Sequence, residues 1–264
     1  MTQIRIGIGG WTYEPWRGGT FYPEGHPQKR ELEYASRAVT ALEVNGTYYS
    51  SFKPATFAKW AAEVPDDFVF AVKASRYATN RKRLDEGAES IARFLGQGIV
   101  ELGAKLGPVL WQLANTKKFD PQEIAGFLKL LPAKQDGLAL RHAVQVRHDS
   151  FHVPEFVELC RAANVAIVYA DSASYPAIAD VSGDFVYARL ENAESRFAAG
   201  YAPSKLDDWA EGVRRWQQGE VPPDLPTFGR PAPKTGRDVF VFMINGAKEK
   251  APAAAMALIG RVRG

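Results

Sequence analysis

The sequence predicts an α/β protein with a (β/α)8 barrel of the TIM type, in a single domain that spans residues 1–264. Three observations predict this fold. Eight short stretches have the pattern of strands, segments that are mostly helical separate them, and polar residues recur at the C-terminal ends of nearly all the strands. A doubly wound open sheet is the alternative. The recurrence of the polar ends favours the barrel, in which all of them would share one mouth.

Composition limits the class of protein. With 264 residues, 46% of them hydrophobic, the chain is long enough to bury one large core. A net charge of +3 permits an anionic partner without requiring one. The single cysteine, Cys160, excludes an internal disulfide. The start lacks the apolar segment of a signal peptide and no apolar run is long enough to span a bilayer, so we expect a cytoplasmic protein that does not enter a membrane.

The first half of the chain alternates predicted strands with helices. Residues 4–10 are a strand, and their glycines lack the third glycine and the following helix of a dinucleotide-binding turn. Apolar periodicity predicts further strands at 39–45, 68–73 and 109–113, and helices at 27–38, at 56–64 and through Ile91, Phe94, Leu95 and Leu102. Residues 75–83, after the third strand, form the most basic stretch of the chain.

The second half continues the alternation less regularly. Asp120, Pro121 and Glu123 have the spacing of a capped helix start, and Cys160 lies on the apolar stripe of the next helix, where a packing role is expected. Strands are predicted at 142–149, 165–171, 185–191 and 238–245, and helices at 205–218 and 253–262. The connection after residue 171 is too short for a full helix, and the prolines of 221–233 predict an extended surface loop.

Polar side chains at the strand ends are the predicted active site. Side chains alternate along a strand, so the last inward positions can be read from the sequence. They are Glu43, Asn45, Lys73, Gln112, Gln145, Arg147, Tyr169, Asp171, Arg189, Glu191 and Asn245. Buried charges are costly unless paired or used, so such a ring indicates an active site, with a structural network of salt bridges as the alternative.

The residue types suggest roles. Glu43 and Asp171 are the candidates for general acid or base, and His148 is a third proton-transfer candidate that could equally be structural. Lys73, Arg147 and Arg189 suit a phosphate or carboxylate. The predicted substrate-binding residues are Trp11, Asn45, Tyr48, Lys73, Gln112, Gln145, Arg147, Arg189, Glu191 and Asn245. We expect no cofactor and no metal, because no metal-binding histidine spacing is present and nearby cations compete for the acids.

Three functions follow from these residues. The first is an enzyme, of hydrolase or lyase type, that acts on an anionic small molecule. The second is a barrel that binds nucleic acid or processes phosphodiesters, with the basic loop 75–83 binding phosphates and loop aromatics such as Tyr48, Tyr49 and Tyr77 stacking on bases. The third is a barrel that binds a ligand without catalysis. The oligomeric state is left open.

Several motifs together resemble the YecE-like family, domain of unknown function 72. They are residues 10–13 with Trp16, 42–49, 70–73, 106–108 with Gln112 and Leu113, 144–148 and 170–172. The resemblance implies a TIM-type barrel and leaves the reaction open, although likeness to endonuclease-IV-type barrels makes a phosphodiester substrate conceivable by analogy of fold. Gln145 stands where the family usually has glutamate, Phe151 where it usually has tryptophan, and 244–246 where it has Asn-Asn-Asp, so family chemistry could be altered here.

Overall fold

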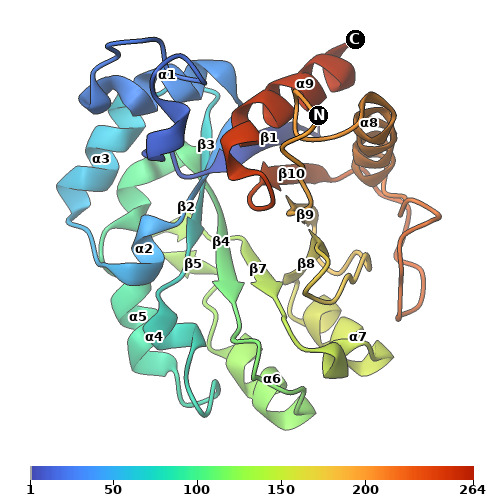
Figure 1. The fold of residues 1–264 in the computed structure, drawn as a ribbon. Helices are drawn as coiled ribbons and strands as arrows, with labels where there is room; N and C mark the ends of the chain where they lie inside the picture. Colours follow the sequence, from blue (N-terminus) through green and yellow to red (C-terminus); the bar gives the residue numbers. More distant parts are fainter. Residues whose placement is uncertain (1) are drawn as a thin grey trace.

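Eight parallel strands close into a barrel in the computed structural model, which describes residues 2–264. Around the barrel the order is β1, β10, β9, β8, β7, β4, β3 and β2, and each strand pairs with both neighbours (Figure 1). The predicted TIM-type barrel is therefore confirmed. The barrel strands are β1 (Ile4–Gly9), β2 (Ala41–Val44), β3 (Val69–Lys73), β4 (Leu106–Gln112), β7 (His142–Gln145), β8 (Ala166–Asp171), β9 (Phe185–Leu190) and β10 (Asp238–Met243).

Helices surround the barrel on its outer side (Figure 1). They are α1 (Glu31–Ala38), α2 (Gly46–Tyr49), α3 (Pro54–Glu63), α4 (Arg76–Thr79), α5 (Ala88–Leu95), α6 (Pro121–Lys129), α7 (Pro154–Ala162), α8 (Pro203–Gln217) and α9 (Ala251–Arg263). A small hairpin, β5 (Lys134–Gln135) with β6 (Leu138–Ala139), precedes β7. None of the described helices combines the length and the apolar character needed to cross a membrane.

Two apolar layers explain why the strands are buried on both faces. The larger layer lies between strands and helices and contains Trp111, Phe127 and Trp216. The smaller layer fills the barrel with alternate residues of the strands, including Ala71 and Phe242. Both faces of each strand therefore contact apolar groups, as in other parallel sheets covered by helices.

The glycines of β1 have a packing reason. A Cβ atom on Gly7 would lie 2.0 Å from the carbonyl oxygen of Ala41, so β1 and β2 approach each other only because Gly7 has no side chain. This close contact accounts for the glycine-rich first strand that superficially resembles a nucleotide-binding turn.

Of three expectations for the connections, one is wrong and two agree with the structure. The predicted third helix does not reach Leu102: α5 ends at Leu95, Gly98 has a φ of 107°, and Leu102 lies in a separate 3-10 segment, Ile99–Lys105. Within the described chain, no helix forms between β8 and β9, in agreement with the short connection. The proline-rich segment 221–233 is extended, and its Gly229 amide donates to the buried carboxylate of Asp180, which anchors it.

Candidate active site at the barrel mouth

The centre of the mouth is a buried ion cluster formed by Glu43, Arg189 and Glu191. The guanidinium of Arg189 donates to Glu43 from Nε at 3.1 Å and from Nη2 at 3.2 Å, and to Glu191 from Nη1 at 2.9 Å. The Tyr187 hydroxyl donates to Glu43 at 2.7 Å. Glu43 comes from β2, and the other side chains come from β9 or the position just after it. Because β1 and β10 lie between β2 and β9 in the barrel, the cluster reaches across part of the mouth.

Two amide side chains extend the cluster toward β4 and β7. Gln112 and Gln145 are register partners on these strands, and Gln112 Nε2 donates to Gln145 Oε1 at 2.7 Å. The same oxygen accepts from Arg189 Nη1 at 2.7 Å. Gln145 therefore supplies a neutral acceptor to the guanidinium, while its own Nε2 atom is buried without a hydrogen-bond partner.

Glu43 is held in its ionised form. The residue has no exposed surface, and burial alone would raise the pKa of its carboxyl. Arg189 and Lys73, with hydrogen bonds from Tyr187 and Arg189, more than offset this effect, so the pKa of Glu43 lies below its ordinary value. This arrangement favours a role for Glu43 in positioning Arg189 over one in proton transfer.

Lys73 and Arg147 are the cations of the mouth that have no carboxylate partner. Among residues 2–264, neither forms an ion pair; instead Lys73 Nζ lies 4.4 Å from the centre of the Tyr48 ring, and the Arg147 guanidinium lies 4.1 Å from that of Tyr175. Burial, aided by the charge of Arg189, lowers the pKa of Lys73 to about 8. Burial also lowers the pKa of Arg147, whose Nε atom is buried without a hydrogen-bond partner.

Tyr169 and Asp171 do not face the barrel interior, so their predicted inward orientation is wrong. On β8 the inward residues include Ala166 and Val168, which places Tyr169 in the outer layer against Trp209 and Trp216. Asp171 follows the same outward register and accepts a hydrogen bond from Asn192. Burial raises the pKa of the Asp171 carboxyl, but this acid is outside the central cluster.

The predicted inward orientation of Asn245 is also wrong. The inward residues of β10 and its end are Phe240, Phe242 and Ile244, and Asn245 is exposed. An apolar side chain, Ile244, thus occupies the inward position for which an amide was expected.

His148 lies at the mouth edge after β7, where it has a local structural contact. Its Nδ1 atom is 2.9 Å from the Ser150 hydroxyl and accepts from the Ser150 amide at 3.1 Å, so it caps the 3-10 turn Asp149–Phe151. Its predicted role in proton transfer stays a prediction. No group of three or more His, Cys, Asp or Glu side chains in the described part of the chain is arranged to hold a metal ion.

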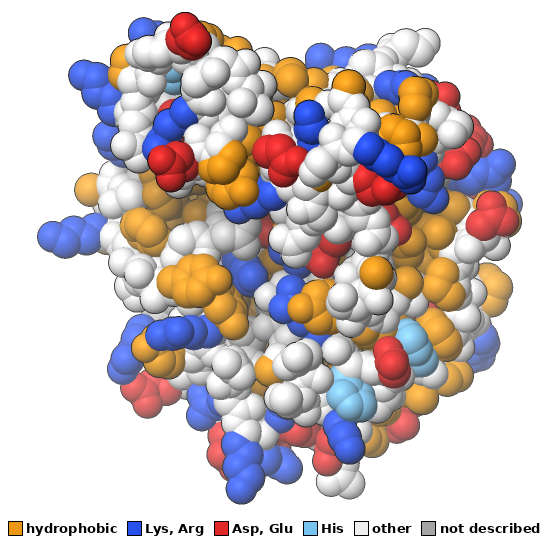
Figure 2. Space-filling view, in the orientation of Figure 1, with side chains coloured by type: hydrophobic (Ala, Val, Ile, Leu, Met, Phe, Trp, Pro, Cys, Tyr) orange, Lys and Arg blue, Asp and Glu red, His pale blue; other side chains and the backbone are white. Residues whose placement is uncertain are grey.

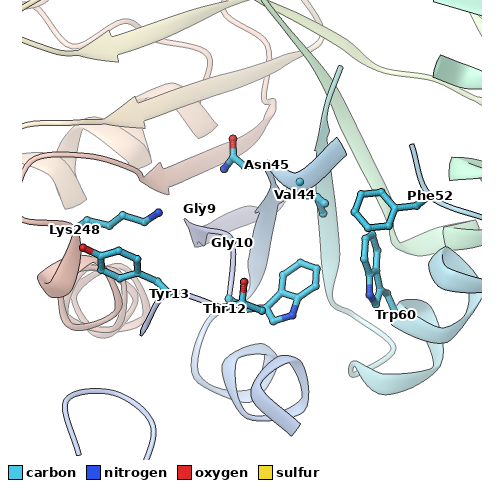
Figure 3. Close-up of a pocket in the computed structure, with 11 residues that line it drawn as sticks. Gly9, Gly10, Thr12, Tyr13, Val44, Asn45, Phe52, Trp60 and Lys248 are labelled. Atoms are coloured by element: carbon cyan, nitrogen blue, oxygen red, sulfur yellow. The ribbon is translucent and has the colours of Figure 1, made fainter. Parts of the chain in front are cut away.

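A cavity of about 410 Å³ lies beside the ion cluster, at the ends of β1 and β2. Trp11 and Asn45, both predicted binding residues, line it together with Phe52, Trp60 and Lys248. Figure 3 shows Phe52 and Trp60 on one side, Lys248 and Tyr13 on the other, and Asn45 between them. Figure 2 shows Lys and Arg groups near the middle of the face, with hydrophobic side chains around them.

Sequence reasoning missed two residues of this region. Tyr187 lies two positions before Arg189 on the inward face of β9, so the strand period could have identified it. Lys248 begins the short 3-10 turn Lys248–Lys250 after β10, which no strand or helix periodicity in the sequence marks. Burial lowers the pKa of Lys248 and the charge of Glu43 opposes this shift, which places Lys248 within electrostatic range of the cluster.

The fold and the charged mouth define a TIM-barrel protein with its polar groups at the C-terminal ends of the strands. The chain belongs to the family described as protein of unknown function DUF72, which matches residues 5–264. A crystal structure of a DUF72 family protein from Thermotoga maritima is 22% identical, with a TM-score of 0.74 over 99% of this chain and 100% of the other. No match was found among curated proteins.

More distant likeness extends to enzymes with the same fold. The crystal structure of SacUVDE is 7% identical, with a TM-score of 0.58 over 100% of this chain and 98% of the other. A D-psicose 3-epimerase is 11% identical, with a TM-score of 0.50 over 98% and 96%. At these identities the likeness shows the fold alone.

Proposed function

We propose that this protein is an enzyme that acts on a phosphorylated or carboxylated small molecule at the barrel mouth, with acid/base chemistry of the hydrolase or lyase type. The observation that carries the proposal is the pair of cations, Lys73 and Arg147, which are largely buried at the mouth and have no carboxylate partner within the described chain. Their location at the C-terminal ends of the strands supports the proposal, because enzymes with this barrel carry out catalysis at that face.

The charges of the cluster leave room for an anion. Glu43 and Glu191 oppose Arg189, Lys73 and Arg147, so two carboxylates face three cations. Arg189 is already paired on both sides. Because an unpaired buried charge is costly, a bound anion at the two remaining cations would stabilise the site.

Unused hydrogen-bond donors support the same ligand chemistry. Arg147 Nε and Gln145 Nε2 are buried and donate to no described group. An arginine presents several N–H groups in a planar fork that fits phosphate or carboxylate oxygens. We therefore assign anion binding to Arg147, with Gln145 as a neutral donor.

Lys73 is the best-supported group for proton transfer. Catalytic acids and bases work best when their pKa lies near the operating pH, and the pKa of Lys73 is about 8. Below that pH the ammonium of Lys73 attracts the anion and can donate a proton to a leaving group. In this proposal Glu43 holds Arg189 in place.

Anion titrations of three variants test the proposal. Arg147→Ala removes charge-assisted hydrogen bonds worth about 1.5–3 kcal/mol, so sulfate or phosphate affinity should fall about 10- to 100-fold in calorimetry. Arg147→Lys should recover part of the loss. Arg196→Ala is the matched control, because Arg196 is exposed and pairs with Glu194. Equal affinities in the Arg147→Ala and Arg196→Ala proteins would refute the proposed site.

A nucleic-acid substrate is the second candidate, favoured by the exposure of aromatic and basic residues next to the mouth. Tyr49 and Tyr77 are 65% and 66% exposed, and Arg76, on α4, lies 5.4 Å from the Tyr77 ring centre. Such groups can stack on bases and contact phosphates. Its test is retention of single-stranded DNA or RNA that weakens with salt; absence of binding at low salt would exclude it. A tight ligand that is never converted would instead indicate a non-catalytic barrel.

A further inference from the structure

The aromatic cavity beside the mouth is the feature that the proposed anion site leaves unexplained. Trp11, Phe52 and Trp60 form its apolar wall and are only partly buried. The rings contact one another: Trp11 and Trp60 meet edge to face with centres 5.1 Å apart at 83°, and Phe52 and Trp60 are tilted at 59° with centres 5.3 Å apart. Their partly uncovered surfaces therefore line a hollow that is present without any ligand.

The opposite side of the cavity is polar and cationic. Lys248 lies 4.6 Å from the centre of the Tyr13 ring and forms no ion pair with any residue that the structure describes. Thr12 and Asn45 add polar atoms between this lysine and the aromatic wall (Figure 3). The cavity thus offers an apolar surface to one end of a ligand and a positive charge to the other.

The cavity adjoins the ion cluster at the end of β2, because Val44 and Asn45, which line the cavity, directly follow Glu43. Asn45 lies two positions after Glu43, and its side-chain amide donates to the Glu43 carbonyl at 3.3 Å. A Cβ atom on Gly9 would lie 3.0 Å from Ile244 Cδ1 and 3.1 Å from Asn45 Nδ2, so the absence of a side chain at Gly9 lets Ile244 and Asn45 pack closely against β1. Lys248 lines the cavity, and the negative charge of Glu43 partly offsets the lowering of the Lys248 pKa by burial.

We infer that this cavity binds the ring of the ligand whose anionic group binds at Lys73 and Arg147, and that the ligand is therefore an aryl or similarly flat, apolar phosphate or carboxylate. The inference rests on the proposed function, because it requires the anion site. Lys248 would lie between the two parts and contact the anion or the polar edge of the ring.

Matched pairs of anions test the inference by calorimetry. The pairs are methyl phosphate with phenyl phosphate, and acetate with benzoate, so that both anion types are covered. Burying one ring should make the aryl member bind about 10- to 100-fold more tightly. Trp60→Ala should remove most of this difference and leave the affinity for the methyl or acetate member within about twofold, because only the ring contacts Trp60.

The outcomes separate the two proposals. If neither member of either pair binds the wild-type protein, the anion site itself is wrong. If both members bind equally well, the anion site stands and the ring site is wrong. Retained methyl phosphate binding shows that Trp60→Ala is folded, and Phe52→Leu provides a second, milder change of the same wall. Met256→Ala, which removes an exposed apolar side chain outside the cavity, should leave the aryl preference unchanged; loss of the preference there would also contradict the inference.

Discussion

Replacement of Arg189 by methionine removes the only cation that contacts both Glu43 and Glu191 in the described chain. Methionine keeps an unbranched side chain of similar length, so the change removes charge and hydrogen bonds more than volume. The wild-type guanidinium makes four hydrogen bonds: two to Glu43, one to Glu191 and one to Gln145. All four are buried.

The expected cost is large because two acids lose their partner. Breaking a buried ion pair by removing one member typically costs about 3–5 kcal/mol, since an uncompensated charge is left in the interior. Arg189 and Glu43 are 2% and 0% exposed, so solvent cannot replace the lost contacts. We expect Arg189→Met to lower the free energy of unfolding by an amount in this range at neutral pH.

The loss should depend on pH with a defined sign. In the wild type the pKa of Glu43 is lowered, so its ionised form stabilises the fold above the pKa of the unfolded chain and this contribution is lost as pH falls. In Arg189→Met, burial acts without the arginine and raises that pKa. The variant should then gain stability relative to wild type as pH falls and the acid is protonated.

Urea unfolding, followed by the fluorescence of the six tryptophans, measures this effect at pH 7 and pH 5. The double variant Glu43→Gln with Arg189→Met should be more stable at pH 7 than Arg189→Met alone, because it removes one of the two carboxylates that Arg189→Met leaves buried without a partner. A cost below about 1 kcal/mol, or the same cost at both pH values, would refute the assignment of Arg189 as the charge that holds the cluster together.

Two further variants probe the charge of the mouth. In the wild type, sulfate affinity should fall by up to about tenfold per pH unit above pH 8, because Lys73 loses its proton there. Lys73→Arg should flatten this pH profile because a guanidinium stays charged. An unchanged slope in the variant would contradict the role of Lys73. Gln145→Glu introduces a carboxylate where an amide oxygen lies 2.7 Å from Arg189, so sulfate affinity measured by calorimetry should fall on the order of tenfold. Equal or tighter binding would show that Gln145 is remote from the anion.

The charged centre of the site could be predicted because each member interrupts an otherwise apolar strand. Glu43, Lys73 and Arg189 follow runs of small or apolar residues, and buried charges in a barrel are costly unless they are paired or serve a function. The strand period then placed them inward, and the structure brings Glu43, Arg189 and Glu191 into direct contact. Fold and centre were therefore accessible from the sequence.

The orientation of β8 was not accessible, for a physical reason. Every strand of this barrel is apolar on both faces, so Ile167, Val168, Tyr169 and Ala170 offer no alternation that marks the interior. A shift of one residue exchanges the two faces, which is what the prediction for Tyr169 and Asp171 did. Tyr169 lies outside the barrel, where the tryptophans of α8 pack against its ring. The same ambiguity misplaced Asn245.

Gln145 is the residue at which the charge of the site bears most directly on the proposed anion ligand. A carboxylate at this position would give Arg189 a third acidic neighbour and would balance the mouth, with three acids facing Arg189, Lys73 and Arg147. The amide keeps the hydrogen bond to Arg189 but contributes no charge, so one positive charge is left over. Its unpartnered Nε2 atom adds a donor that a carboxylate lacks. Under the proposed function, the amide of Gln145 thus leaves the mouth with the positive charge and the free donor that a bound anion would use.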